Sequence, residues 1–228
     1  RYLMFPVFKF IYVGPFDKDE EEEEKRLPLS AEHPSNSISK SESEDFEDNS
    51  LSEYEYTKDA SIVQSPVYQG NYALQLTANG DSAYAHSDGF ETTVGDTIEV
   101  YIRSDTIQDS TAFFFGVYEA IGGYRPVESY EVSFFNQNNN FDVKRNTDAG
   151  GVETIGSGSF NASSNTWYRL EIVWGNPTIT ATIYDLSGSE QASASGDDAT
   201  HTDGSVGFGR FDNNNSGSKS FFDAFQVI

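Results

Sequence analysis

Aromatic, arginine and carboxylate side chains recur along the alternating segments of this chain in a pattern that suits a sugar ligand. Six of them form the candidate ligand-binding set on the predicted solvent face: Tyr101, Arg103, Tyr118, Glu131, Trp167 and Arg169. Aromatic rings stack on sugar rings, while carboxylates and guanidinium groups hydrogen bond to hydroxyls. A structural alternative stays open, in which a loop or a docked strand covers the rings and Arg169 forms a cross-strand ion pair with a glutamate.

The segment from Asn165 to Gly188, NTWYRLEIVWGNPTITATIYDLSG, predicts two strands folded back on each other. Because side chains alternate along a strand, each half has one apolar face. Those faces consist of Tyr168, Leu170, Ile172 and Trp174 in the first strand, and of Ile179, Ala181 and Ile183 in the second. The intervening Gly-Asn-Pro is typical of a turn. This hairpin therefore predicts an antiparallel sheet with one buried face.

Short segments of the same kind recur from residue 44 to residue 228. The further predicted strands are residues 45–56, 61–65, 72–78, 83–87, 97–104, 112–118, 129–136, 141–146, 190–195, 205–211 and 219–228. Clusters of Gly, Asn, Asp and Ser separate nearly all of them, and helical periodicity is nearly absent. About a dozen short strands with such punctuation predict an all-β, antiparallel two-sheet sandwich.

The N-terminal part of the chain has a different composition. Residues 1–14 contain YLMFPVFKFIYV, which predicts a strand with apolar side chains on both faces, although a signal-peptide remnant is an alternative. It is shorter than the roughly 20 residues of a membrane-spanning helix, so no membrane span is expected. Residues 15–43 are acidic and Ser-rich, which predicts a solvated linker.

A strand enclosed on both faces suits donation to the sheet of a neighbouring subunit. The residues predicted to contact that partner are Leu3, Phe5, Phe8, Phe10 and Tyr12. Because the linker is long enough to leave its own domain, we expect a homo-oligomer or a head-to-tail polymer. Docking of the same strand onto its own domain is the alternative.

The charge of the chain narrows the choice of partners. With 37 acidic and 14 basic residues the formal net charge is −23, so binding to nucleic acid or to an anionic membrane is not expected. Such acidity is typical of proteins that work in high salt or in a Ca²⁺-rich exterior. We therefore expect a halophilic or marine prokaryotic, extracellular setting. The chain contains no cysteine, which excludes disulfides and thiol chemistry.

Five motifs occur in order: FEDNSLSEY, PVYQGNYALQL, the NTWYRLEIVW hairpin, DGSVGFGRF and FFDAFQV. Because of these motifs, residues 44–228 resemble the concanavalin A-like jelly roll in its laminin G-like and carbohydrate-binding-module versions. The resemblance implies a jelly-roll sandwich, here with an N-terminal strand extension, whose first and last strands pair. It also implies a structural Ca²⁺ held by Glu47 and Asp223. Relatives often carry a second carboxylate where this chain has Ala224, and two solvated carboxylates are the alternative.

Glycoside hydrolases with this fold carry two carboxylates on one strand in a Glu-x-Asp-x-x-Glu spacing, so that acid and nucleophile flank one bond. That spacing does not occur here, and the acidic clusters at Glu53 and Glu55 and from Glu128 to Glu131 are predicted to be exposed strand positions. The three histidines, His33, His86 and His201, are scattered and are predicted to lie on the surface or in loops. The sequence therefore predicts a protein that is not an enzyme.

Two functions follow from these observations. The first is an extracellular structural subunit, assembled through its N-terminal strand into a surface filament or a virion-type assembly. The alternative is a lectin-like module that binds carbohydrate at the cell surface. A glycan-processing enzyme is a third hypothesis from another class.

Overall fold

The computed structural model describes residues 43–79, 82–119, 126, 128–134, 138–147, 151–211 and 217–228. The predicted N-terminal strand, including Leu3, Phe5, Phe8, Phe10 and Tyr12, and the linker up to residue 42 lie outside the described residues. No helix that the structure describes is long and apolar enough to cross a membrane.

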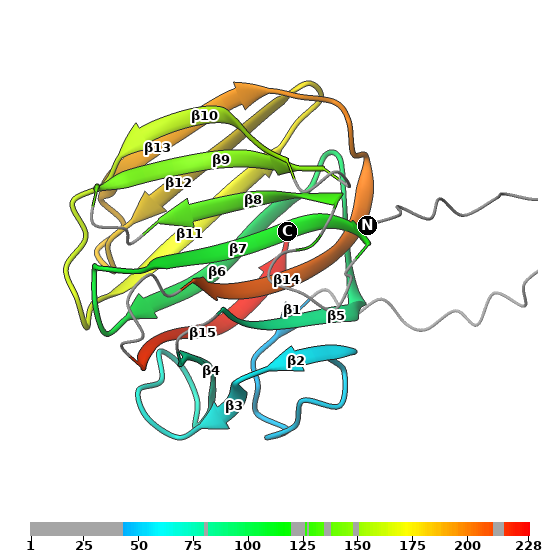
Figure 1. The fold of residues 1–228 in the computed structure, drawn as a ribbon. Coiled ribbons are helices and arrows are strands. Elements are labelled where there is room, and N and C mark those ends of the chain that lie inside the picture. The colour runs from blue at the N-terminus through cyan, green and yellow to red at the C-terminus, as the bar shows by residue number, and fades with distance from the viewer. Residues whose placement is uncertain are drawn as a thin grey trace, which may run out of the picture. The chain divides into compact units, whose positions relative to one another are not determined.

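The described strands form two antiparallel sheets that pack face to face (Figure 1). The first sheet has the order β13 (Glu190–Asp197), β12 (Thr178–Tyr184), β11 (Trp167–Trp174), β6 (Thr97–Ser104), β15 (Ser218–Val227), β4 (Ala73–Ala78) and β3 (Ala60–Val63), and β1 (Ser43–Glu44) also pairs with β15. The second sheet has the order β10 (Val152–Ser159), β9 (Asn140–Asn146), β8 (Glu128–Phe134), β7 (Ser110–Glu119), β14 (Asp203–Phe211), β5 (Ala83–Thr93) and β2 (Tyr56–Lys58). The prediction of an all-β two-sheet jelly roll is confirmed, and so is the pairing of the first and last strands.

The predicted hairpin is present as β11 and β12. Leu170 lies opposite Ile183, and Trp174 lies opposite Ile179. All four of these side chains are fully buried, as the alternation predicts. The two halves of the hairpin therefore contribute one continuous apolar face to the space between the sheets.

The core is densely aromatic where the two sheets meet. The Trp174 ring lies edge-on to the rings of Phe115 and Tyr130, with centroid separations of 5.1 and 5.7 Å. Gly116 lies beside this cluster with φ +56°, and a Cβ there would lie 2.6 Å from the Trp174 indole. Only glycine fits this position, because the backbone is left-handed and the indole fills the space.

The structure differs from the predicted strands in two places. Residues 45–55 do not form a strand but a series of turns, in which Asp45 and Asp48 accept hydrogen bonds from the backbone amides two residues ahead. These Asx turns compete with ladder pairing. Conversely, β10 was not predicted because its sequence, VETIGSGS, has little apolar alternation. Its Gly158 faces the backbone of β13, where a Cβ would lie 2.3 Å from the Ser193 carbonyl oxygen, so only glycine lets the two strands approach this closely.

A buried ion pair connects the sheets. Arg210 on β14 and Asp109 have fully buried side chains, and the guanidinium Nη2 lies 3.2 Å from the Asp109 carboxylate. Arg210 Nη1 also donates to Ser104 at 2.9 Å and to Thr111 at 3.0 Å, and its Nε donates to Ser218 at 3.1 Å. These partners come from β6, β7 and β15, so a single side chain joins strands of both sheets.

Candidate functional site

Four of the six predicted ligand-binding residues lie together on the outer face of the first sheet. Tyr101 and Arg103 belong to β6, and Trp167 and Arg169 belong to β11. The register of these neighbouring strands places Trp167 opposite Arg103 and Arg169 opposite Tyr101. The four side chains therefore share one face, as the alternation predicts.

The other two predicted residues lie in the second sheet, Tyr118 on β7 and Glu131 on β8. The Tyr118 side chain is 71% exposed, whereas Glu131 is fully buried with its carboxylate 3.6 Å from Lys144 Nζ. The expectation that all six share one surface is therefore wrong. Alternation identifies the face of a strand, but the chain crosses to the opposite sheet between β6 and β7, and no local pattern marks that crossing.

A loop covers part of the four-residue surface. Residues 64–72 connect β3 to β4, and the Tyr68 ring from this loop stacks on Tyr101 with a centroid separation of 3.6 Å and an interplanar angle of 10°. Trp167 lies 6.2 Å from the Tyr68 ring and is only 9% exposed. Trp167 therefore fits the alternative left open by the sequence, in which a loop covers the aromatic rings. Tyr68 was not predicted, and its only sequence signal is its place in the motif PVYQGNYALQL.

The two predicted metal ligands hold this loop through its backbone amides. Asp223 Oδ2 accepts hydrogen bonds from the N–H groups of Tyr68 at 2.8 Å and Gln69 at 3.0 Å. Glu47 Oε1 accepts from the N–H groups of Asn71 at 2.6 Å and Tyr72 at 2.9 Å. Asp223 Oδ1 also accepts the N–H of Ala224, and Glu47 Oε2 accepts an N–H from the Asn71 side chain.

The pKa values of the two carboxylates are shifted in opposite directions, although N–H groups bond to both. The amide and side chain of Asn71 hold the pKa of Glu47 below its usual value. Burial raises the pKa of Asp223 in spite of its N–H partners, and the charge of Glu47 adds to the increase. The two carboxylates are therefore close enough to repel each other, and the loop amides offset that repulsion.

As arranged here, all four carboxylate oxygens of Glu47 and Asp223 accept N–H groups, which a bound cation would have to replace. Ca²⁺ requires six to eight oxygen ligands, whereas N–H groups approach these carboxylates from the loop. Within the described ranges, no group of three or more His, Cys, Asp or Glu side chains is placed to hold a metal. Calcium binding at Glu47 and Asp223 stays a prediction from the resemblance.

Arg169 is at the centre of a charged network on the exposed side of the sheet. Its guanidinium pairs with Glu99, lies 3.1 Å from Glu171 and sits over the Tyr184 ring at 4.3 Å. Burial lowers the pKa of Arg169, but the negative charges of Glu99 and Glu171 raise it by more. The pKa of Arg169 is therefore above its usual value. The cross-strand ion pair that the sequence left open is therefore present, and it holds the guanidinium in a fixed position.

A hollow of about 330 Å³ lies beside this network. Tyr68, Tyr101, Glu99 and Arg169 form one side of it, and the turn from Asp185 to Gly188 between β12 and β13 forms the other. The Asp185 carboxylate accepts N–H bonds from Ser187 at 2.9 Å and Ser189 at 3.0 Å, which gives the turn a defined shape. The Ser187 hydroxyl and these N–H groups hold the pKa of Asp185 below its usual value. The hollow thus combines a ring, a guanidinium and carboxylates.

The two described histidines, His86 and His201, do not line this hollow, and His33 lies outside the described residues. His86 on β5 is only 4% exposed, so the prediction that it lies on the surface or in a loop is wrong. Its ring stands between those of Tyr84 and Phe114, at centroid separations of 5.5 and 5.8 Å. His201 is half-buried in the connection between β13 and β14.

Searches for relatives by sequence found no matching family model and no matching curated protein. Solved structures do match. A carbohydrate-binding module, CBM66, from Bacillus subtilis has a TM-score of 0.53 at 9% identity, over 75% of this chain and 96% of the module. A legume lectin-like domain from Entamoeba histolytica has a TM-score of 0.52 at 10% identity, over 75% and 89% of the two chains. A beta-1,3-glucanase from Mycobacterium marinum has a TM-score of 0.52 at 11% identity, over 82% and 97%.

These similarities define the fold of the chain. The chain has the concanavalin A-like jelly-roll fold that lectins, carbohydrate-binding modules and glucanases share. At such low identity the likeness concerns the fold alone. Since proteins that bind sugars and proteins that cleave them both adopt this fold, function has to be argued from the side chains.

Proposed function

We propose that this domain binds carbohydrate in the hollow beside Tyr101 and does not act on it as an enzyme. The observation that carries the proposal is the combination of Tyr101, Arg169 and Glu99 at the wall of one hollow. Together they supply a ring edge, hydrogen-bond donors and hydrogen-bond acceptors, which are the groups that recognise a sugar. The similarity to lectins and to a carbohydrate-binding module supports the same class of ligand.

The polar groups of the hollow are held in place before any ligand arrives. Arg169 is fixed by Glu99 and Glu171, and Glu99 in turn accepts a hydrogen bond from Gln226 at 2.7 Å. Groups that are already ordered lose little conformational entropy on binding. At about 330 Å³ the hollow is at the small end of the roughly 300 to 1,000 Å³ of ligand pockets, which suits one terminal sugar ring or one residue of a chain.

A glycan array followed by calorimetry on the best ligand tests the proposal. Replacing Arg169 with Met keeps most of the side-chain volume but removes the donors, and we expect it to weaken binding at least tenfold. Arg103→Met is the matched control, because Arg103 has the same charge and lies on the same face, yet it bonds to Asn165 and does not line the hollow. Equal losses in the two variants, or no glycan bound by the unmutated protein, would refute the site.

The absence of catalysis is tested separately. The glucanase neighbour makes glycan hydrolysis the relevant alternative, although the Glu-x-Asp-x-x-Glu spacing does not occur in the sequence. We expect no new reducing ends when the protein is incubated with the glycan that it binds. Release of reducing ends by the unmutated protein would identify an enzyme.

A second candidate function is the structural subunit. It is favoured by the apolar sequence of residues 2–13, which would place apolar side chains on both faces of the predicted strand, and by the acidic sequence that follows. Binding of carbohydrate and assembly through this segment are compatible with each other. For either function we propose an extracellular or cell-surface setting in a prokaryote, on the basis of the net charge of −23.

A further inference from the structure

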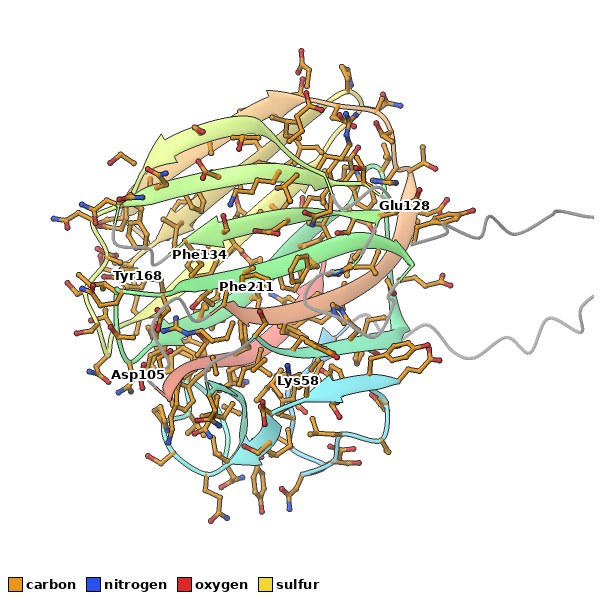
Figure 2. The ribbon with its side chains drawn as sticks, viewed as in Figure 1. Lys58, Asp105, Glu128, Phe134, Tyr168 and Phe211 are labelled. Atoms are coloured by element: carbon orange, nitrogen blue, oxygen red, sulfur yellow. The ribbon has the colours of Figure 1, made fainter. Side chains whose placement is uncertain are left out.

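A second hollow, of about 440 Å³, lies at the other end of β13. It is lined by Tyr118, Glu128, Thr200, His201, Thr202 and Asp203. These residues come from β7, from the start of β8, where Figure 2 shows Glu128, from the connection between β13 and β14, and, for Asp203, from the start of β14. None of them takes part in the hollow beside Tyr101.

Hydrogen bonds and an ion pair fix the connection between β13 and β14, which forms one wall of this hollow. Asp198 accepts hydrogen bonds from the Tyr130 hydroxyl at 2.7 Å and from the Thr200 amide at 2.8 Å, and it pairs with Arg145 at 2.7 Å. Arg145 also donates to the Thr200 hydroxyl at 2.7 Å, and the His201 amide donates to the Tyr130 hydroxyl at 3.2 Å. The network presents the side chains of Thr200, His201 and Thr202 on a preformed wall.

The groups that line the hollow include two carboxylates and three hydroxyls. Glu128 and Asp203 contribute carboxylates. Burial holds the pKa of His201 below its usual value, and its ring bonds to the Asn146 backbone. The Nε2 of the same ring is buried away from solvent, so the imidazole forms part of the wall without offering a hydrogen-bond partner to a ligand. Arg145, the nearby cation, is engaged by Asp198 and Glu153.

We propose that this second hollow binds the protonated amine of a hydroxyl-bearing ligand, an amino sugar. An ammonium group has three donors and no acceptor, which matches the carboxylates of Glu128 and Asp203 and the hydroxyl oxygens of Thr200 and Thr202. Tyr118, with 71% of its surface exposed, supplies a ring face for the sugar or for a cation–π contact. The net charge of −23 attracts cationic ligands and repels anionic ones.

This site is independent of the proposed function of the first hollow. The two hollows lie at opposite ends of β13, a strand of eight residues, and are therefore separated by about 25 Å. A single sugar ring cannot span that distance. The domain therefore has two binding sites of different chemistry, which two ligands, or two separated parts of one long glycan, occupy at the same time.

The probe for the test is the fully deacetylated glucosamine tetramer, measured by calorimetry at physiological salt, with the N-acetylated tetramer as the uncharged counterpart. We expect the deacetylated tetramer to bind at least tenfold more tightly. Asp203→Asn and Tyr118→Ala should each weaken its binding by tenfold or more. Glu190→Gln is the matched control, because it removes the same charge from an exposed position of β13 and should leave the affinity unchanged.

Three outcomes would overturn the proposal: no binding of the deacetylated tetramer, equal binding of the acetylated tetramer, or equal weakening by Asp203→Asn and Glu190→Gln. The last would mean that the ligand is attracted by the acidic surface in general. The Arg169→Met variant separates the two proposals, because Arg169 lines only the first hollow. This variant should still bind the deacetylated tetramer, even if the first hollow proves not to bind a glycan.

Discussion

His86 should make the stability of the domain depend on pH. Burial lowers its pKa from the usual 6.5 to about 4, and its Nδ1 has no hydrogen-bond partner among the described residues. The unfolded chain therefore takes up a proton below pH 6.5, whereas the folded domain does so only near pH 4. The stability associated with neutral His86 is fully present above pH 6.5 and is lost as the pH falls towards 4, by about 3 kcal/mol in total.

The substitution that tests this is His86→Phe. A phenyl ring keeps the contacts with Tyr84 and Phe114, and Gly207, whose missing Cβ leaves room for the imidazole, also leaves room for it. The variant cannot titrate at this position. Between pH 7 and pH 4 we expect the unmutated protein to lose about 3 kcal/mol more unfolding free energy than His86→Phe.

Urea unfolding at pH 7, 6, 5 and 4, followed by tryptophan fluorescence, measures this difference. The comparison with His86→Phe is needed because burial raises the pKa of Glu44 to about 7, so that Glu44 stabilises the folded state as the pH falls. This contribution is the same in both proteins and cancels in the difference between them. His201→Gln is a useful control, since His201 is only half-buried and should give a smaller change. Parallel pH profiles for His86→Phe and the unmutated protein would refute the reasoning.

Three further predictions concern the ion pair, the cations and the N-terminal segment. Asp109→Ala leaves the buried Arg210 guanidinium without its carboxylate and should cost about 3 to 5 kcal/mol in chemical unfolding; an unchanged midpoint would contradict this. Removing salt and Ca²⁺ should lower the melting temperature, because a net charge of −23 repels itself. If chelation alone has no effect while salt does, screening is the cause and a Ca²⁺ site at Glu47 and Asp223 is ruled out. Phe8→Asp should give a soluble, folded monomer by light scattering, and strand donation is wrong if the unmutated protein is itself monomeric at high concentration.

Strand positions and faces could be read from the sequence because both are local. The alternation around Leu170 and Ile183 depends only on the period of an extended backbone, and the buried face in the structure is the predicted one. Turns such as residues 45–55 were misjudged, since their aspartates satisfy backbone amides that a strand would otherwise pair. β10 was missed because its glycines are required by contact with β13, which is distant in sequence.

The candidate site could be predicted only in part. Tyr101 and Arg169 were found because they share a face with their neighbours on β6 and β11. Tyr68 could not be found in this way, since its position depends on hydrogen bonds from its loop to Asp223, which lies 155 residues away. The same long-range arrangement covers Trp167, so the exposure of an outward-facing residue depends on what folds over it.

The pairing of β1 with β15 has a mechanical consequence. Ser43 lies opposite Gln226, so the chain enters and leaves the domain at neighbouring points. Tension applied through the two ends would pull these antiparallel strands apart like a zipper, and their hydrogen bonds would break one after another because they lie along the direction of pulling. If the domain is loaded through both of its ends, the two-residue pairing of β1 should open at low force, and resistance at the C-terminal end then rests on the pairing of β15 with β6.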